Sequence, residues 1–242
     1  MTQQQREAID SMLRASPFDP AGDLREQRPL FEQMATAAPV PADVVTTPGR
    51  LGGVPVIWID IPGTTTGGVI VYFHGGFFAI GSAAASVGLA SDLARQARMQ
   101  VVTVDYRLAP EHPYPAAIDD AMTAYRGLLD SGQDVARVAF AGESAGASLA
   151  VVTLVAIARA GLPTLLIQAG SHEILLDDAI RLAARAAYDD VAVTLDVVPG
   201  VPHVFQAFAP VLDEGEAALT RAGTFLREHT GTLAAQTAER QG

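Results

Sequence analysis

The sequence contains no cysteine among its 242 residues, and this absence removes several kinds of chemistry at once. A chain without cysteine forms no disulfide, holds no metal ion through thiolates and has no thiolate nucleophile. The cysteine count therefore gives no indication of the redox compartment, and we predict no metal site.

Basic side chains are also scarce. The sequence has 16 lysines and arginines against 27 aspartates and glutamates, which gives a formal net charge of −11 at pH 7. Proteins that bind nucleic acid neutralise phosphates with clustered lysines and arginines, and no segment of the sequence resembles such a patch. We therefore expect no nucleic-acid partner.

Long apolar runs and a leader sequence are absent as well. The longest apolar run, residues 145–158, is too short to span a bilayer and is typical of a buried helix. Residues 1–7 lack the basic segment followed by an apolar segment that marks a signal peptide. We therefore expect no membrane partner and a cytoplasmic location.

The sequence does contain an alternation of strand-like and helix-like segments. Two helix-like segments, 6–15 and 24–38, come first and are separated by a break at 16–20. After them, short apolar runs rich in β-branched residues alternate with segments of helical spacing. The predicted strands are residues 54–61, 69–73, 100–104, 135–141, 165–168 and 192–198. The predicted helices are residues 84–98, 115–129, 145–160, 177–188 and 214–228.

This alternation predicts an α/β fold. Most of the predicted strands are continuous apolar runs, as expected of strands covered on both faces. Strands that alternate with helices form a mostly parallel sheet through right-handed crossovers, and the length suits one large domain. We predict N-terminal helices in residues 1–40, an α/β core in 41–230 and a disordered polar tail in 231–242.

A candidate nucleophile lies between a predicted strand and a predicted helix. Residues 142–146 have the sequence GESAG, directly after the apolar run 135–141. Where a strand reverses sharply into a helix, glycines two positions before and after a serine allow the turn and leave the hydroxyl exposed at its apex. We therefore predict that Ser144 is a nucleophile.

A serine nucleophile needs a base, which is usually a histidine held by a carboxylate. After a strand–serine–helix turn of this kind, the carboxylate and then the histidine follow along the chain. This order leaves His172, His203 and His229. We favour His203, because it follows the strand-like run 192–198 and the turn 199–202, at the sheet edge where ligands bind in α/β folds. His229 lies at the end of a predicted helix, where cationic residues are common.

The carboxylate is expected after the strand that precedes this histidine, at residues 165–169. Glu173 lies in the loop at the end of that strand. Asp177 and Asp178 fall where the next helix should start, and they could serve as its N-cap and first-turn acid. We favour Glu173 and keep Asp177 as the alternative.

Acyl transfer also needs hydrogen-bond donors for the oxyanion that forms on the carbonyl oxygen. Residues 74–78, HGGFF, directly follow a predicted strand, where such a loop contributes backbone N–H groups. We predict that Gly75, Gly76 and Phe77 supply one set of donors. The N–H of Ala145, next to the nucleophile, supplies the other. Phe77 stands in place of a third glycine and cannot adopt every backbone geometry open to glycine.

Four segments carry a more specific signal. They are YFHGG at 72–76, DYRLAPEHPYPAA at 105–117, GESAG at 142–146 and PGVPHVF at 199–205. Together and in this order, they resemble the hormone-sensitive-lipase family of α/β-hydrolases, chiefly its bacterial esterases. The resemblance extends from about residue 6 to residue 229.

This resemblance implies an α/β-hydrolase fold whose N-terminal helices form part of a cap over the site. It also implies a serine carboxylesterase that acts on short acyl esters without a cofactor. The roles of Ser144 and His203 carry over directly. The acid of the family lies about thirty positions before its histidine, which is Glu173 here, with glutamate in place of the more usual aspartate.

One departure from the family is large. The chain passes from residues 161–163 directly to the run 164–170, where family members carry several dozen residues that include a core strand and most of the rest of the cap. If the strand at 165–169 pairs directly beside the strand at 135–141, a right-handed crossover still connects them. If the sheet keeps the family arrangement instead, the gap exposes an open edge that destabilises the protein or pairs two copies as a homodimer.

We therefore predict a serine carboxylesterase that acts on a small ester substrate through an acyl-enzyme intermediate. The shortened junction supports an alternative, a non-catalytic α/β-hydrolase-like binder or an inactivated esterase fragment. In the 105–117 segment, Arg107 is expected to pair with Asp105 or Glu111 and to fix a proline-rich loop.

Overall fold

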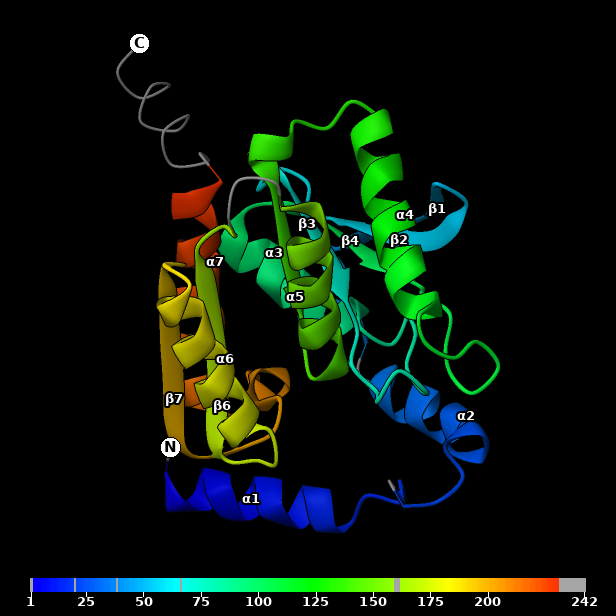
Figure 1. Cartoon of the computed structure of the whole chain (residues 1–242). Coiled ribbons are helices and arrows are strands. Elements are labelled where there is room, and N and C mark those ends of the chain that lie inside the picture. The colour runs from blue at the N-terminus through cyan, green and yellow to red at the C-terminus, as the bar shows by residue number, and fades with distance from the viewer. Residues whose placement is uncertain (1, 20, 38, 66, 159–161, 231–242) are drawn as a thin grey trace. The chain divides into compact units, whose positions relative to one another are not determined.

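A computed structural model of the chain (Figure 1) describes residues 2–19, 21–37, 39–65, 67–158 and 162–230. The predicted disordered tail, 231–242, lies outside the described residues. The chain divides into two compact units, one made of residues 18–157 with the chain from 223 onward, and one made of residues 1–17 with 158–222. We call the first the serine unit and the second the histidine unit.

The serine unit is built on a five-stranded sheet with the strand order β1-β2-β4-β3-β5. β2 is antiparallel to β1 and β4, whereas β3 is parallel to β4 and β5. All five residues of β3 are buried, as expected of a central strand covered on both faces. The strands are β1 (Val45–Leu51), β2 (Val54–Asp60), β3 (Val69–Phe73), β4 (Gln100–Val104) and β5 (Val138–Gly142).

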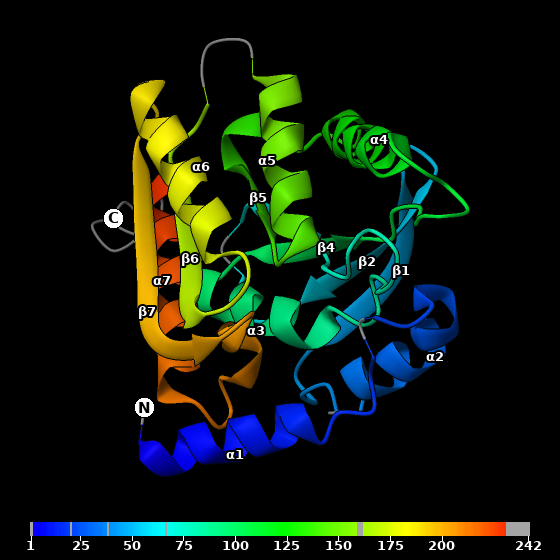
Figure 2. The same ribbon diagram turned by 60° about the horizontal axis from the view of Figure 1, so that its bottom comes forward.

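Helices cover both faces of this sheet (Figure 2). α4 and α5 pack against one another on one face, and α3 lies on the other. A short 3-10 helix, Val135–Arg137, leads into β5, so the predicted strand at 135–141 begins three residues later than expected. The α-helices of the unit are α2 (Leu24–Ala35), α3 (Val87–Ala97), α4 (Ala116–Asp130) and α5 (Ala145–Ile157).

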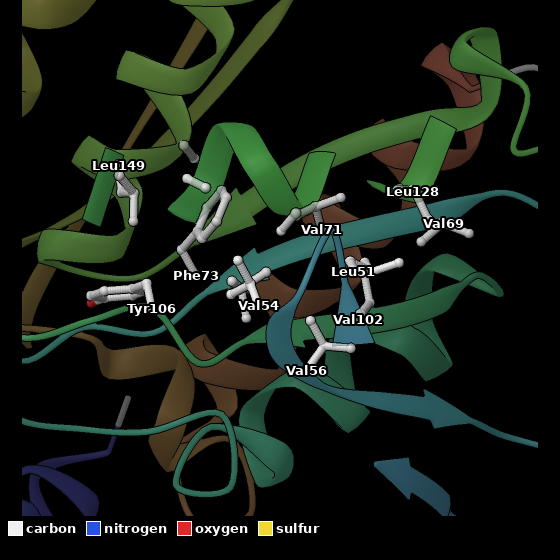
Figure 3. Packing of buried hydrophobic residues seen from close by; sticks show 14 residues of the cluster. Leu51, Val54, Val56, Val69, Val71, Phe73, Val102, Tyr106, Leu128 and Leu149 are labelled. Carbon is white, nitrogen blue, oxygen red and sulfur yellow. The ribbon is translucent and has the colours of Figure 1, made fainter. Parts of the chain in front are cut away.

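A hydrophobic core joins the sheet to α4 and α5 (Figure 3). Each fully buried valine or leucine side chain contributes about 1.5–3 kcal/mol relative to an exposed one. The cluster therefore fixes the strands, and with them the loops that leave the carboxyl ends of β3, β4 and β5. Its buried members are Leu51, Val54, Val56, Val69, Val71, Phe73, Val102, Val104, Tyr106, Ala121, Ala124, Leu128, Leu149 and Ala150.

The histidine unit has its own sheet of two parallel strands, β6 (Leu165–His172) and β7 (Val193–Pro202). The connection between them is α6 (Leu176–Tyr188). Two neighbouring parallel strands need a long connection, usually a helix. The alternation of apolar runs and helical spacing in the sequence therefore predicts this parallel pair. Across the two units, the predicted α/β fold with a mostly parallel arrangement of strands is confirmed.

The two predicted N-terminal helices belong to different units. α1 (Gln3–Arg14) lies in the histidine unit, where the Gln5 side chain donates a hydrogen bond to Asp213 at 3.0 Å. α2 lies in the serine unit. The predicted domain boundary at residue 40 stays a prediction. The core of the histidine unit consists of Ile9, Val198, Val201, Phe205, Leu212 and Ala218.

The last helix, α7 (Asp213–His229), begins in the histidine unit and ends in the serine unit. In its final part, Gly223 packs against Gln96, at the end of α3, and the Arg227 guanidinium donates a hydrogen bond to the Gln96 carbonyl. None of the helices within the described ranges has the length and apolar character needed to cross a bilayer.

The strands on either side of the shortened junction do not pair. Within the described residues, β5 is hydrogen bonded to β3 alone and β6 to β7 alone. A hydrogen-bonded pair between the strand at 165–169 and the strand at 135–141 is therefore not observed among the described residues. β5 and β6 belong to separate sheets.

Candidate active site

Ser144 occupies the turn between β5 and α5. Its φ of 53° lies in the left-handed region, which costs a non-glycine residue about 1–2 kcal/mol. Only glycine fits two positions later, because a Cβ at position 146 would lie 2.0 Å from the carbonyl oxygen of Phe73. The chain thus forms the tight strand–turn–helix in which a serine hydroxyl is presented at the apex.

The segment 74–80, which we call the oxyanion loop, leaves the carboxyl end of β3 and turns back on itself. The N–H groups of Ala79 and Ile80 both donate to the Gly76 carbonyl oxygen at 2.9 Å. The φ angles of Gly76, Phe77 and Phe78 are 108°, 58° and 59°. Phe77, at the position of the missing third glycine, therefore adopts the left-handed conformation that glycine favours.

His74 fixes the start of this loop. Its ring stacks on the ring of Tyr106 with centroids 4.2 Å apart, and the Tyr106 hydroxyl donates to the His74 carbonyl oxygen at 2.6 Å. Burial lowers the pKa of His74, so the ring is neutral near pH 7. These contacts tie the start of the loop to Tyr106.

Three of the four predicted oxyanion donors have free N–H groups. The fourth, Gly75, donates its N–H to Glu143 Oε1 at 2.7 Å. Within the described residues, the N–H groups of Gly76, Phe77 and Ala145 have no acceptor. The oxyanion loop also lies against the turn that carries Ser144, which we call the nucleophile turn, because a Cβ at position 75 would lie 3.0 Å from Ser144 Cβ.

Glu143 is a functional candidate that the sequence analysis did not assign. Its two carboxyl oxygens accept hydrogen bonds from the Gly75 N–H and from the Tyr72 hydroxyl. Part of the residue is exposed, but its carboxyl group is buried. Burial raises the pKa of Glu143 to about 7, although both hydrogen bonds act in the opposite direction. The signal in the sequence was an acid next to the nucleophile, but nothing in it identified Tyr72 as the partner.

The raised pKa of Glu143 predicts a pH-dependent stability. Its unfolded-state pKa is near 4.5, so the folded chain holds this proton more tightly and loses stability as the pH rises from about 4.5 to about 7. At one pKa unit per 1.4 kcal/mol, the loss is roughly 3 kcal/mol. The neighbouring hydroxyls of Tyr72 and Tyr106 have raised pKa values and do not titrate in this range.

Glu143→Gln removes this titration. We expect the melting temperature of the unmodified protein, relative to that of Glu143→Gln, to fall between pH 5 and pH 8. Thermal unfolding of both proteins across this range measures the difference. If the difference in melting temperature between the two proteins is the same at every pH, Glu143 has an ordinary pKa.

The far end of the oxyanion loop is held by α2. The Arg28 guanidinium donates hydrogen bonds to the carbonyl oxygens of Ala79 and Ala109, both at 2.7 Å. It also forms an ion pair with Glu111 at 2.8 Å. One cation thereby joins α2, the oxyanion loop and the proline-rich loop after β4.

The expected partner of Arg107 was wrong. Arg107 forms an ion pair with Asp120 of α4 at 2.8 Å. Asp105 instead accepts a hydrogen bond from the Ala83 N–H at 3.0 Å, and Glu111 pairs with Arg28. The proline-rich loop is therefore fixed from α2 and α4 instead of by ion pairs of its own.

In the histidine unit, the structure brings Glu173 and His203 together. Glu173 Oε1 lies 3.2 Å from His203 Nδ1, and Glu173 Oε2 accepts a hydrogen bond from the Gly170 N–H at 2.8 Å. The Glu173 side chain is 7% exposed and that of His203 is 36% exposed. A carboxylate at Nδ1 favours the tautomer with its proton there, which leaves Nε2 able to accept a proton.

The register of β6 and β7 explains this contact. Both strands are parallel, so the loops that carry Glu173 and His203 leave the same edge of the sheet. The strands approach closely at that edge, because a Cβ at position 170 would lie 2.3 Å from the Val201 carbonyl oxygen. Ser171 Oγ accepts a hydrogen bond from the Gly200 N–H at 2.7 Å and ties the ends of the two strands together.

The alternative candidates lie elsewhere. The Asp177 side chain is 81% exposed, in the first turn of α6, and lies 3.7 Å from Arg181. His172 is exposed at the end of β6, and His229 Nδ1 lies 2.8 Å from the Phe225 carbonyl oxygen within α7. Within the described ranges, no group of three histidine, aspartate or glutamate side chains is placed to hold a metal ion.

Comparison with known families matches residues 70–164 and 155–207 to the family described as alpha/beta hydrolase fold. The match is in two pieces that overlap at residues 155–164, and the predicted junction at 161–164 lies within this overlap. Together the two pieces span more than half of the chain.

Individual relatives cover most of the chain. An acetyl-hydrolase of Streptomyces hygroscopicus is 33% identical over 79% of this chain and 84% of that protein. An esterase of Acinetobacter venetianus is 29% identical over 82% of this chain and 87% of that protein. The crystal structure of an esterase from the bacterial hormone-sensitive lipase family superposes with a TM-score of 0.89, at 32% identity, over 96% of this chain and 100% of that one.

The alignment with the acetyl-hydrolase also contains positions that this chain lacks. It spans 256 positions, but the 79% of this 242-residue chain that it covers amounts to about 191 residues. About 65 positions of that relative therefore have no counterpart in this chain.

Proposed function

The chain belongs to the alpha/beta hydrolase fold family, in its hormone-sensitive lipase branch of esterases, and we propose that it hydrolyses carboxylic esters with Ser144 as the nucleophile. His203 is the general base and Glu173 is the carboxylate that orients it. Gly76, Phe77 and Ala145 donate their N–H groups to the oxyanion.

The reaction has two halves. His203 Nε2 takes the proton of Ser144 Oγ as that oxygen attacks the ester carbonyl carbon, and the carbonyl oxygen becomes the oxyanion. The intermediate collapses to an acyl-enzyme, and the alcohol leaves with the proton from His203. Water then attacks the acyl carbonyl carbon as His203 takes its proton, and a second oxyanion forms. This intermediate collapses, the carboxylic acid leaves, and Ser144 Oγ takes the proton back from His203.

The observation that carries the proposal is the contact between the Ser144 turn and an oxyanion loop with free N–H groups. Each donor aimed at a developing oxyanion contributes about 3 kcal/mol to transition-state stabilisation. The Gly76 and Phe77 N–H groups lie in a loop that touches the nucleophile turn, and the Ala145 N–H adjoins the nucleophile. The Glu173–His203 pair supplies the base that such a site needs.

The substrate class follows from the reaction and from the relatives. An acetyl-hydrolase and two esterases are similar to this chain over most of its length, and we propose short acyl esters as substrates. The predicted cytoplasmic location and the predicted homodimer stay predictions from the sequence.

We expect the purified protein to hydrolyse p-nitrophenyl acetate and p-nitrophenyl butyrate, because these esters combine a short acyl chain with a good leaving group. Release of p-nitrophenol is followed by absorbance against a buffer blank. A folded protein that releases none above the blank from either ester would support the alternative, a non-catalytic binder or an inactivated esterase fragment.

A further inference from the structure

We propose that Glu143 is a positioning residue that, with Tyr72, holds the oxyanion loop against the nucleophile turn and so aims the Gly76 and Phe77 N–H groups. The inference rests on the proposed ester hydrolysis. It assigns a role to a residue that does not itself touch the substrate.

The Glu143 carboxylate joins three parts of the serine unit. Its own backbone belongs to the turn that carries Ser144. One oxygen accepts the Gly75 N–H at 2.7 Å, at the start of the oxyanion loop, and the other accepts the hydroxyl of Tyr72 in β3. β3 and β5 are paired neighbours, with Tyr72 opposite Ala141, so the side chain bridges two strand ends and one loop.

The loop needs such an anchor because its conformation is not one that the chain adopts readily. Three consecutive residues, 76–78, have φ angles in the left-handed region, and two of them are phenylalanines. Each such phenylalanine costs about 1–2 kcal/mol. At its far end, the loop is held by the hydrogen bonds to the Gly76 carbonyl and by the Arg28 contact with Ala79. Glu143 is the corresponding anchor at the near end.

The anchor also sets which N–H groups remain free. Because the Glu143 carboxylate takes the Gly75 N–H, that group cannot bind the oxyanion, and the next two N–H groups are left as donors. The loop is also packed closely against the turn at this point, since a Cβ at position 75 would lie 3.0 Å from the Glu143 carbonyl oxygen. Without the carboxylate, the Gly75 N–H at the start of the loop would have no acceptor.

The test compares Glu143→Ala with Glu143→Gln, using p-nitrophenyl butyrate. Alanine removes the acceptor, whereas glutamine keeps an amide oxygen for the Gly75 N–H and can donate its amide N–H to the Tyr72 oxygen. We expect Glu143→Ala to lower kcat about 100-fold with KM changed less than about 3-fold, because misaimed donors weaken the transition state and not the substrate complex. Glu143→Gln should restore kcat to within about 10-fold of the unmodified protein.

Rates are divided by the concentration of active serines, titrated with a fluorophosphonate carried to completion, so that a loss of folded protein does not count as a loss of kcat. Asp43→Ala is the matched control, because it removes an exposed carboxylate of the same unit that pairs with Arg95. It should leave kcat and KM unchanged. If Glu143→Ala does not fold, Tyr72→Phe removes one of the two hydrogen bonds and should lower kcat about 5-fold or more at constant KM.

Two outcomes overturn the inference. One is a kcat for Glu143→Ala, or for Tyr72→Phe in its place, within about 3-fold of the unmodified protein. The other is a loss that Glu143→Gln shares in full, or one that appears in KM. Ser144→Ala is measured in parallel. If the unmodified protein shows no Ser144-dependent hydrolysis, the proposed function fails, whereas Ser144-dependent hydrolysis that is insensitive to Glu143 overturns only the role of Glu143.

Discussion

Replacing Ser144 with alanine is expected to lower kcat for p-nitrophenyl butyrate by about 10⁵-fold or more. Without the hydroxyl, no acyl-enzyme forms, and only the oxyanion donors and substrate binding remain to accelerate direct attack by water. The measurement is the initial rate of p-nitrophenol release by the two purified proteins at equal concentration. Removal of the side chain at 144 leaves the glycines that make the turn in place, so the fold should persist.

Ser148→Ala is the matched control for this result. Ser148 is an exposed serine four residues further along the chain, in the first turn of α5. Its replacement removes the same hydroxyl group and leaves Ser144 unchanged. We expect its rate to equal that of the unmodified protein. If Ser144→Ala and Ser148→Ala hydrolyse the ester equally fast, the nucleophile is not Ser144.

Glu173→Gln is expected to have the second largest effect, a loss of about 10³–10⁴-fold in kcat. The Glu173 carboxylate lies 3.2 Å from His203 Nδ1. In the proposed reaction it holds the proton on Nδ1 and stabilises the imidazolium that forms. An amide at this position can donate to Nδ1, which favours the tautomer with its proton on Nε2 and blocks that nitrogen as a base. Steady-state rates on p-nitrophenyl butyrate measure the loss.

Asp177→Asn separates the two candidate acids. It makes the same change of carboxylate to amide four positions away, in an exposed side chain of the first turn of α6. Its kcat should stay within about 2-fold of the unmodified value, because surface substitutions away from a site have small effects. A large loss in Asp177→Asn together with an active Glu173→Gln would assign the acid to Asp177.

Local sequence patterns predicted much of the serine unit correctly. The runs at 69–73 and 100–104 are strands with the predicted bounds, β3 and β4, because a short continuous apolar run leaves little choice of structure in a buried sheet. The turn at Ser144 was also predictable, since close approach of the backbone demands its glycines. The predicted family is confirmed by the comparisons.

Other features depend on contacts that no local pattern records. β1 was not predicted, because its sequence VTTPGRL is polar and includes proline and glycine, and its strand conformation comes from pairing with β2. The Arg107 partner and the contact of Glu143 with Tyr72 join residues that are distant in the sequence or on different elements. These contacts become visible only when the tertiary structure is known.

The sequence predicted a missing segment at residues 161–164, but it did not determine how the strand at 165–169 pairs. The strand at 165–169 could pair beside the strand at 135–141 or keep the family arrangement with a gap, and both agreed with the connection rules. In the structure it pairs with β7 in a separate sheet. Ser144 and its donors therefore belong to one unit, and the Glu173–His203 pair belongs to the other. The proposed reaction uses residues from both.

The central claim is that Ser144 is an activated nucleophile, and a fluorophosphonate probe tests it most directly, because such probes react with a serine whose proton a base removes. After reaction of the folded protein with the probe, intact mass and peptide mass spectrometry count the adducts and locate them. The account predicts one adduct per chain, on Ser144, formed much more slowly in Glu173→Gln. A folded protein that remains unlabelled, or that is labelled at another residue, would contradict it.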